Sequence, residues 1–244
     1  MQKHNTRFNP TANGPLHIGH IYMALVNMTE AHKSGGKFIL RIEDDQPEWN
    51  WRIPPVETRQ IIHGFENDLR WMGIEPDEVK IQTAMHLDMK AYTGHLRDIA
   101  ELRLVNRFMF DPQPELTYSD MTPYPYAPYL TAQRVIMDSM SNINLLIRGE
   151  DLLTEYTLYA FFCEYFGLPR PRMIYIPRLK TDIGGELLAE VSKTSGKNSI
   201  ASYREAGINQ IWIMDRLAKS CLVDPKGEWT LDNLQREPRW SVDF

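Results

Sequence analysis

Two histidines at a spacing of three, in His17-Ile18-Gly19-His20, are the first residues whose types and spacing indicate chemistry. They follow a turn-rich segment, 9–15, and open an apolar-periodic run, so both rings are expected on one face near the N-terminus of a helix. Helix N-termini attract phosphate, and Gly19 has no side chain to hinder a nucleotide's approach to the backbone. The tetrapeptide therefore predicts a phosphate site; the alternative is that one histidine caps the helix and the other lies at the surface.

A second candidate lies at 191–197, where the small polar sequence Val-Ser-Lys-Thr-Ser-Gly-Lys places the ammonium of Lys193 where it could meet a pyrophosphate. The surrounding stretch, 166–204, has an excess of basic residues over three acidic ones. These basic residues are Arg170, Arg172, Arg178, Lys180, Lys193, Lys197 and Arg204. We expect this patch to contact nucleic acid, and the alternative is an ordinary solvated basic surface.

Composition narrows the class of protein. Lys and Arg number 27 against 32 Asp and Glu, a net charge of −5, so nucleic acid could be bound only through a local patch. With 244 residues, 43% of them hydrophobic, the chain is expected to fold as one large domain or one and a half. Cys163 and Cys221 lie far apart without a Cys/His cluster, which predicts neither a disulfide nor a structural zinc or other metal site. Because no signal segment or long apolar run is seen, we expect a cytoplasmic protein without a membrane partner.

The elements that must position these residues alternate along the chain. Strands are expected at 6–8, 38–42, 79–81, 145–147 and 173–176. Helices are expected at about 16–32, after Pro54-Pro55, at about 84–104, 131–140 and 151–166, and as a C-terminal pair after a hairpin that turns at Gly184-Gly185. Helical crossovers of this length imply a parallel sheet whose binding crevice lies at the carboxyl ends of the strands, where 9–14 and 43–46 fall.

Taken in order, several segments resemble a class I aminoacyl-tRNA synthetase, and within that class the glutamyl-tRNA synthetase catalytic domain and its truncated glutamyl-queuosine relatives. Residues 6–20 are similar to the family's TRFAPSPTG-LH-G signature, and 38–44 to a strand that ends in RIED. Residues 148–151 resemble the IRG-acidic segment, 191–196 stand where the KMSKS loop is expected, and 202–207 are similar to the segment after that loop. The resemblance implies an α/β fold of the Rossmann-like, HIGH-type nucleotidyl-transferase kind, a parallel sheet with helices on both faces.

The resemblance also implies an activity, in which glutamate attacks the α-phosphate of ATP and the glutamyl group then passes to a ribose of tRNA, with Mg²⁺ screening the phosphates. His17, His20 and Lys193 are then the catalytic residues. ATP binding is assigned to Thr11, Asn13, Gly14, His17, Gly19, His20, Ser192 and Lys193. Glutamate binding is assigned to Arg7, Asn9, Thr11, Glu43, Tyr129, Gln133 and Arg148.

In this assignment Arg7 and Arg148 bind the carboxylates, since a guanidinium offers planar bidentate geometry. Glu43 takes the ammonium. Tyr129 and Gln133 are assigned through a likeness to the family's Tyr-x-x-Ala-Asn, which needs one inserted residue before Asp138. Other interpretations stay open: Tyr129 packed on the core, and Arg41 and Arg148 as structural partners of Asp44 or Asp151.

The domain expectations are a first half of the catalytic domain at 1–110, a shortened connective insertion at 111–128, a second half at 129–198 and a helical segment at 199–244. No anticodon-binding domain is expected, because few residues come after Gly196. The insertion is short and lacks the Cys-rich zinc element of many relatives. Glu190 stands where the first lysine of the KMSKS loop is expected, which puts activity in question. The sequence thus leaves open which tRNA or other acceptor is used, whether the chain turns over at all, and its oligomeric state.

Overall fold

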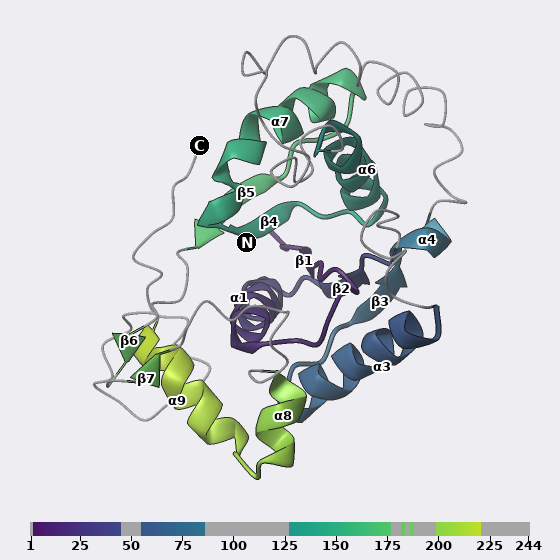
Figure 1. Cartoon of the computed structure of the whole chain (residues 1–244). Coiled ribbons are helices and arrows are strands. Elements are labelled where there is room, and N and C mark those ends of the chain that lie inside the picture. Colours follow the sequence, from purple (N-terminus) through teal and green to yellow (C-terminus); the bar gives the residue numbers. More distant parts are fainter. Residues whose placement is uncertain are drawn as a thin grey trace, which may run out of the picture.

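Parallel strands form the centre of the protein, with helices above and below them (Figure 1). The computed structural model of the chain describes residues 2–44, 55–85, 127–176, 182–183, 186–187 and 199–220. Its first half comprises β1 (Thr6–Phe8), α1 (Ile18–Ser34), β2 (Phe38–Ile42), α3 (Pro55–Trp71), β3 (Glu78–Ile81) and α4 (Gln82–Met85). Its second half comprises α6 (Ala127–Met140), β4 (Leu145–Gly149), the 3₁₀ helix η2 (Glu150–Glu155), α7 (Tyr156–Tyr165), β5 (Arg172–Ile176), β6 (Asp182–Ile183), β7 (Glu186–Leu187), α8 (Ile200–Glu205) and α9 (Gln210–Ser220).

Strands β1 to β5 form two parallel sheets that lie edge to edge, and β6 and β7 form a separate antiparallel pair. In one sheet the order is β1-β2-β3, and in the other β4 pairs with β5. The backbone amides of Asn144 and Leu145 donate to the Asn5 carbonyl at 3.2 and 3.3 Å, so β4 begins beside β1. The spatial order is therefore β5, β4, β1, β2, β3, and the carboxyl ends of β1, β2 and β4 lie at one edge.

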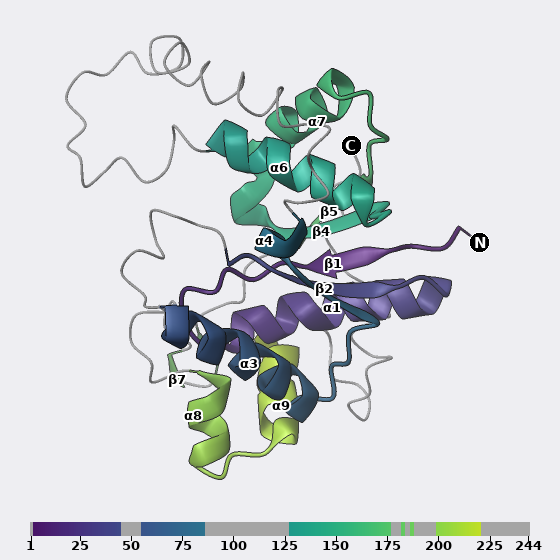
Figure 2. The same ribbon diagram turned by 90° about the vertical axis from the view of Figure 1, so that its right-hand side faces the viewer.

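Helices cover both faces of these strands (Figure 2). Phe8 and Leu40 point toward α1, α3 and α9, in a core that contains Leu25, Phe65 and Leu217. Ile39 and Leu146 point the other way, into a core with α6 and α7. Because side chains alternate along a strand, Arg7, Arg41 and Arg148 share the α6–α7 face with Ile39 and Leu146.

Most of the expected elements are confirmed, including the parallel sheet and the antiparallel β6–β7 pair on either side of 184–185. The helix expected at 151–166 instead begins as 3₁₀ turns, because its N-cap is Gly149, which offers no side-chain cap. α6 begins at Ala127, before the expected 131, since Pro128 is tolerated in a first turn. The 111–126 part of the expected insertion, and most of the 84–104 helix, lie outside the described residues.

None of the helices in the described ranges is long and apolar enough to cross a membrane.

Candidate active site

The two histidines of 17–20 form a stacked pair at the start of α1. His17 is the N-cap, and its Nδ1 accepts from the Gly19 amide at 3.2 Å, while His20 Nδ1 accepts from the His17 amide at 3.2 Å. Their ring centroids are 3.7 Å apart. A Cβ on residue 19 would lie 3.1 Å from His17 Cε1, so glycine leaves the space that the His17 ring fills. One histidine does cap the helix, and both lie half-buried where a helix dipole favours an anion.

Ser199 and Ile200, which follow the lysine-containing segment 191–197 in the sequence, lie beside this pair. Ser199 forms an antiparallel bridge with His17, and the Ile200 amide donates to the Leu16 carbonyl at 2.9 Å. Ser199 also caps α8 through the Ser202 amide at 3.0 Å. The predicted Ser192 and Lys193, with Glu190, fall in 188–198, outside the described residues.

The loop after β1 is tied to the residue that comes after β2. The Glu43 amide donates to the Pro10 carbonyl at 2.9 Å, and the Ala12 amide donates to the Glu43 carbonyl at 2.8 Å. Thr11 Oγ1 donates to Glu43 Oε2 at 3.1 Å, and Asn9 Nδ2 donates to Glu43 Oε1. The 9–13 loop therefore holds Glu43 at the carboxyl edge of the sheet, close to the histidine-bearing helix.

Below the loop lies a set of charges that we call the inner cluster: Arg7, Arg41, Asp138 and Tyr159. Arg7 donates to both Asp138 oxygens, at 2.8 and 3.2 Å, and Arg41 Nη1 donates to Oδ1 at 2.7 Å. Tyr159 Oη donates to Oδ2 at 2.9 Å. With 1% of its side chain exposed, Asp138 receives four hydrogen bonds and joins β1, β2, α6 and α7.

Next to it lies the outer cluster: Glu43, Arg134, Arg148 and Glu155. Arg134 binds Glu43 through two hydrogen bonds, of 2.9 and 3.2 Å, and its Nη1 lies 3.6 Å from Glu155 Oε2. Arg148 Nη2 donates to the same Glu155 oxygen at 2.7 Å. Asn9 links the two clusters, because its Oδ1 accepts from Arg41 Nε at 2.6 Å.

The carboxylates of Glu43 and Asp138 are held ionised. Burial raises the pKa of Glu43, but Arg134, with Arg41 and Arg7, more than offsets this and leaves the value at about 2. Burial likewise opposes ionisation of Asp138, and Arg41 and Arg7 bring its pKa to about 2. Burial lowers the pKa of Arg41, while Asp138 and the other anions around it favour its charged form.

The structure thus brings most of the predicted site together. Ten of the predicted residues lie on the loop after β1, at the start of α1, or in or just after β1, β2 and β4: Arg7, Asn9, Thr11, Asn13, Gly14, His17, Gly19, His20, Glu43 and Arg148. Gln133 is buried in α6 with 3% exposed. Tyr129 lies in the first turn of α6, and its side chain is outside the described part.

Four residues of the clusters had no assigned role: Arg134, Asp138, Glu155 and Tyr159. Arg134 and Asp138 are four apart in α6 and so share one face, a signal that the sequence carries. Arg41 and Arg148 do pair with carboxylates, but with Asp138 and Glu155 and not with Asp44, which binds Thr83 Oγ1 at 2.6 Å. No sequence pattern marks Glu155.

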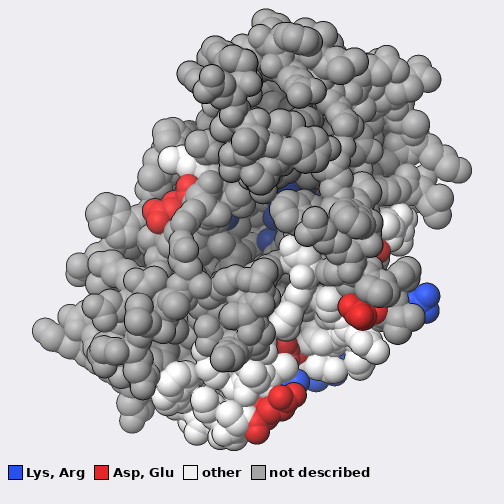
Figure 3. Space-filling model, viewed as in Figure 1, with Lys and Arg blue, Asp and Glu red and all other residues white. Residues whose placement is uncertain are grey.

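Within the described ranges, no group of three or more His, Cys, Asp or Glu could hold a metal ion. The basic stretch 166–204 is described only in part. Arg170 lies over the Tyr156 ring, 4.7 Å from its centroid, and Arg204 donates to Asp68 at 3.0 Å. On the described part of the face in Figure 3, acidic and basic side chains both appear.

Comparison with known proteins shows what this chain is similar to. Residues 3–98 match the family model described as tRNA synthetases class I (E and Q), catalytic domain. A glutamate–tRNA ligase of Akkermansia muciniphila is 29% identical over 87% of this chain and 54% of its own length. One of Methanosphaera stadtmanae is 42% identical over 34% of this chain and 13% of its own length.

A solved structure has the same fold. The glutamate tRNA ligase of Elizabethkingia meningosepticum, in complex with its amino acid, superposes with a TM-score of 0.66 at 19% sequence identity. The match covers 97% of this chain and 64% of the ligase chain. This likeness establishes the Rossmann-like fold of class I synthetase catalytic domains, as expected. The chain spans less than two thirds of the length of each of these relatives.

Proposed function

We propose, because this chain is related to the class I tRNA synthetases of the Glu and Gln group, that it activates glutamate with ATP and transfers the glutamyl group to tRNA. The observation that carries the proposal is one edge of the sheet, where the His17–His20 pair, the bridge to Ser199 and the Arg/Glu clusters all meet.

In the first step, one oxygen of the glutamate α-carboxylate attacks the α-phosphorus of ATP. The bond from that phosphorus to the bridging oxygen breaks, and pyrophosphate leaves. His17 and His20 lie where they can donate to the phosphate oxygens, and the dipole of α1 adds to their effect. Lys193, on the loop that ends at Ser199, is proposed to hold the departing pyrophosphate. No enzyme nucleophile is needed, so catalysis consists of positioning and charge stabilisation.

In the second step, a ribose hydroxyl of tRNA attacks the glutamyl carbonyl and AMP leaves, with the hydroxyl proton passing to solvent or to a phosphate. Mg²⁺ bound to ATP would neutralise phosphate charge. This chain contributes the fixed edge of the sheet, on which the 9–13 loop anchors Glu43 close to the histidines. Basic residues of 170–204 are proposed to contact the tRNA.

The charges at this edge of the sheet also favour glutamate over glutamine. Arg148 has 5% of its side chain exposed, and a buried guanidinium binds a ligand carboxylate more strongly than an uncharged amide, which would not replace the Glu155 carboxylate on it.

Amino-acid-dependent ATP–pyrophosphate exchange tests the proposal, run over all twenty amino acids with and without total tRNA. We expect exchange with glutamate, either alone or only when tRNA is added. His17→Ala should lower it about 100-fold or more, while Arg59→Gln, an exposed change on α3, should leave it unchanged. No exchange in either condition, with a folded protein, contradicts the proposal.

A second candidate is a nucleotide- or amino-acid-binding protein without turnover, favoured by Glu190, an anion where a phosphate-binding lysine is expected. Glu190→Lys separates the two candidates. A rise in exchange supports the enzyme, and ATP binding without exchange in either variant supports the binding protein. Transfer of labelled glutamate to tRNA tests whether the acceptor is tRNA or a small molecule.

A further inference from the structure

The carboxylate of Glu43 has no free face for a ligand. Both of its oxygens are bound by Arg134, at 2.9 and 3.2 Å, and they also accept from Asn9 and Thr11. An ammonium needs those same lone pairs. A ligand that presents an ammonium to Glu43 must therefore displace the guanidinium of Arg134.

Arg148 is occupied at one of its two terminal nitrogens. Its Nη2 holds Glu155 at 2.7 Å, and the side chain is 5% exposed. Its Nη1 has no hydrogen-bond partner among the residues that the structure describes. A ligand carboxylate that binds Nη1 and also takes the Nη2 hydrogen bond must take the place of Glu155.

Arg134 and Glu155 are in contact with each other, at 3.6 Å. Together they present a cation to Glu43 and an anion to Arg148, which are the two charges that the ammonium and side-chain carboxylate of glutamate would present. We propose that Arg134 and Glu155 are an internal stand-in for the substrate and determine specificity, so that glutamate binds only in exchange for this pair. The inference rests on the proposed function for the assignment of Glu43 and Arg148 to the two ends of glutamate.

The exposed fraction of each side chain indicates which members of the outer cluster a ligand can displace. The Arg134 and Glu155 side chains are 18% and 23% exposed, whereas those of Glu43 and Arg148 are 2% and 5% exposed. After displacement, Arg134 and Glu155 are close enough to pair with each other, so neither charge is left buried and alone. The ligand ammonium replaces the Arg134 guanidinium and the side-chain carboxylate replaces the Glu155 carboxylate, so at these two positions the sign of the charge is kept. The α-carboxylate has no counterpart in the pair.

The exchange does not extend to the inner cluster. Asp138 accepts four hydrogen bonds from three side chains, and 1% of its side chain is exposed, so we expect it to keep its partners when a ligand binds. A ligand with both an ammonium and a side-chain carboxylate thus displaces Arg134 and Glu155. A ligand with only one of these groups displaces only one of the two residues.

Calorimetric titration of the full chain with L-glutamate, glutarate and L-glutamine tests this inference. Glutarate lacks the ammonium, and glutamine lacks the side-chain charge. We expect Arg134→Gln to raise affinity for glutamate about tenfold or more, with no such rise for glutarate. Glu155→Gln should raise affinity for glutamate to a similar degree, with no such rise for glutamine.

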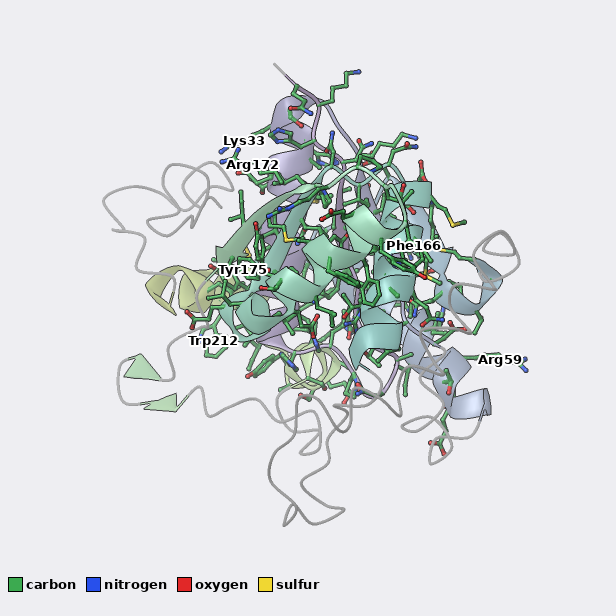
Figure 4. The ribbon with its side chains drawn as sticks, turned by 90° about the horizontal axis from the view of Figure 1, so that it is seen from above. Lys33, Arg59, Phe166, Arg172, Tyr175 and Trp212 are labelled. Atoms are coloured by element: carbon green, nitrogen blue, oxygen red, sulfur yellow. The ribbon has the colours of Figure 1, made fainter. Side chains whose placement is uncertain are left out.

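Matched controls are Arg59→Gln and Glu57→Gln, which change exposed residues of α3 and should leave all three affinities unchanged. Arg59 points away from the body of the protein in Figure 4. If Arg134→Gln does not fold, Arg134→Lys is used instead. It keeps a cation beside Glu43 but cannot form both hydrogen bonds of the guanidinium, so a smaller rise in glutamate affinity is expected.

An unchanged or lowered glutamate affinity in the folded Arg134 and Glu155 variants overturns the inference, and so does the absence of glutamate binding in every variant. Pyrophosphate exchange is measured separately. Tighter glutamate binding in the variants without pyrophosphate exchange supports the inference on Arg134 and Glu155 and contradicts the proposed function. Pyrophosphate exchange together with weaker glutamate binding in Arg134→Gln supports the proposed function and contradicts the inference.

Discussion

The inner and outer clusters lie on the same face of the sheet and contain the same types of charged residue, yet they are built differently. In the inner cluster one carboxylate serves two guanidiniums and a phenol, all deeply buried. In the outer cluster two carboxylates and two guanidiniums form a chain whose middle members, Arg134 and Glu155, are the more exposed ones. Ion pairs of similar length can therefore hold a fold together or remain open to exchange, depending on how many partners each has and how deep it lies.

Asp138→Asn should give the largest loss of stability, because it leaves Arg7 and Arg41 buried without their anion. Breaking such a pair costs about 3 to 5 kcal/mol. Urea unfolding followed by circular dichroism measures the change. Asp44→Asn, at an exposed carboxylate bonded to Thr83, is the control. An equal loss of unfolding free energy in Asp138→Asn and Asp44→Asn would contradict the conclusion that the buried inner cluster holds the fold together.

Acid should weaken both clusters. The pKa values of Glu43 and Asp138 in the folded protein are about 2, below their ordinary values of 4.5 and 3.8. Their stabilisation is thus fully present above the ordinary values and is lost as the pH falls toward 2. Each carboxylate accounts for about 2 to 3 kcal/mol over that range. Unfolding free energies between pH 2 and 6 give the slope, which should be shallower in Asp138→Asn.

His17→Ala should separate stability from activity. Loss of the N-cap costs about 1 kcal/mol, less than the inner cluster contributes. Exchange activity should fall by about 100-fold or more, since a phosphate donor is lost. Urea unfolding and pyrophosphate exchange on the same preparation measure the two effects. Full activity in this variant would remove His17 from the site.

Lys37→Ala should have the smallest effect. Lys37 and Glu78 form a pair of 2.6 Å, as short as any in the two clusters, but their side chains are 58% and 34% exposed. Solvent screens such a pair, so the urea midpoint should not change measurably. A large shift would mean that distance, and not burial, governs the ion pairs of this protein.

Much of the site was predictable because its residues are local in sequence. The His17–His20 spacing, the turn-rich 9–15 segment and the position of Glu43 after a strand each indicate their own place at the edge of the sheet. The roles of Arg134 and Glu155 were not predictable. Their partners are 91 and 7 residues away, and only the packing of α6 and η2 against the strands brings the four charges together.

The sequence by itself determined the alternation of strands and helices, the parallel sheet and the capped, histidine-bearing start of α1, because hydrophobic periodicity and turn residues act over short distances. The tertiary structure alone decided which carboxylate meets which guanidinium. Arg41 pairs with Asp138 and not with nearby Asp44, and Arg134 reaches Glu43, because an ion pair depends on distance and burial in space.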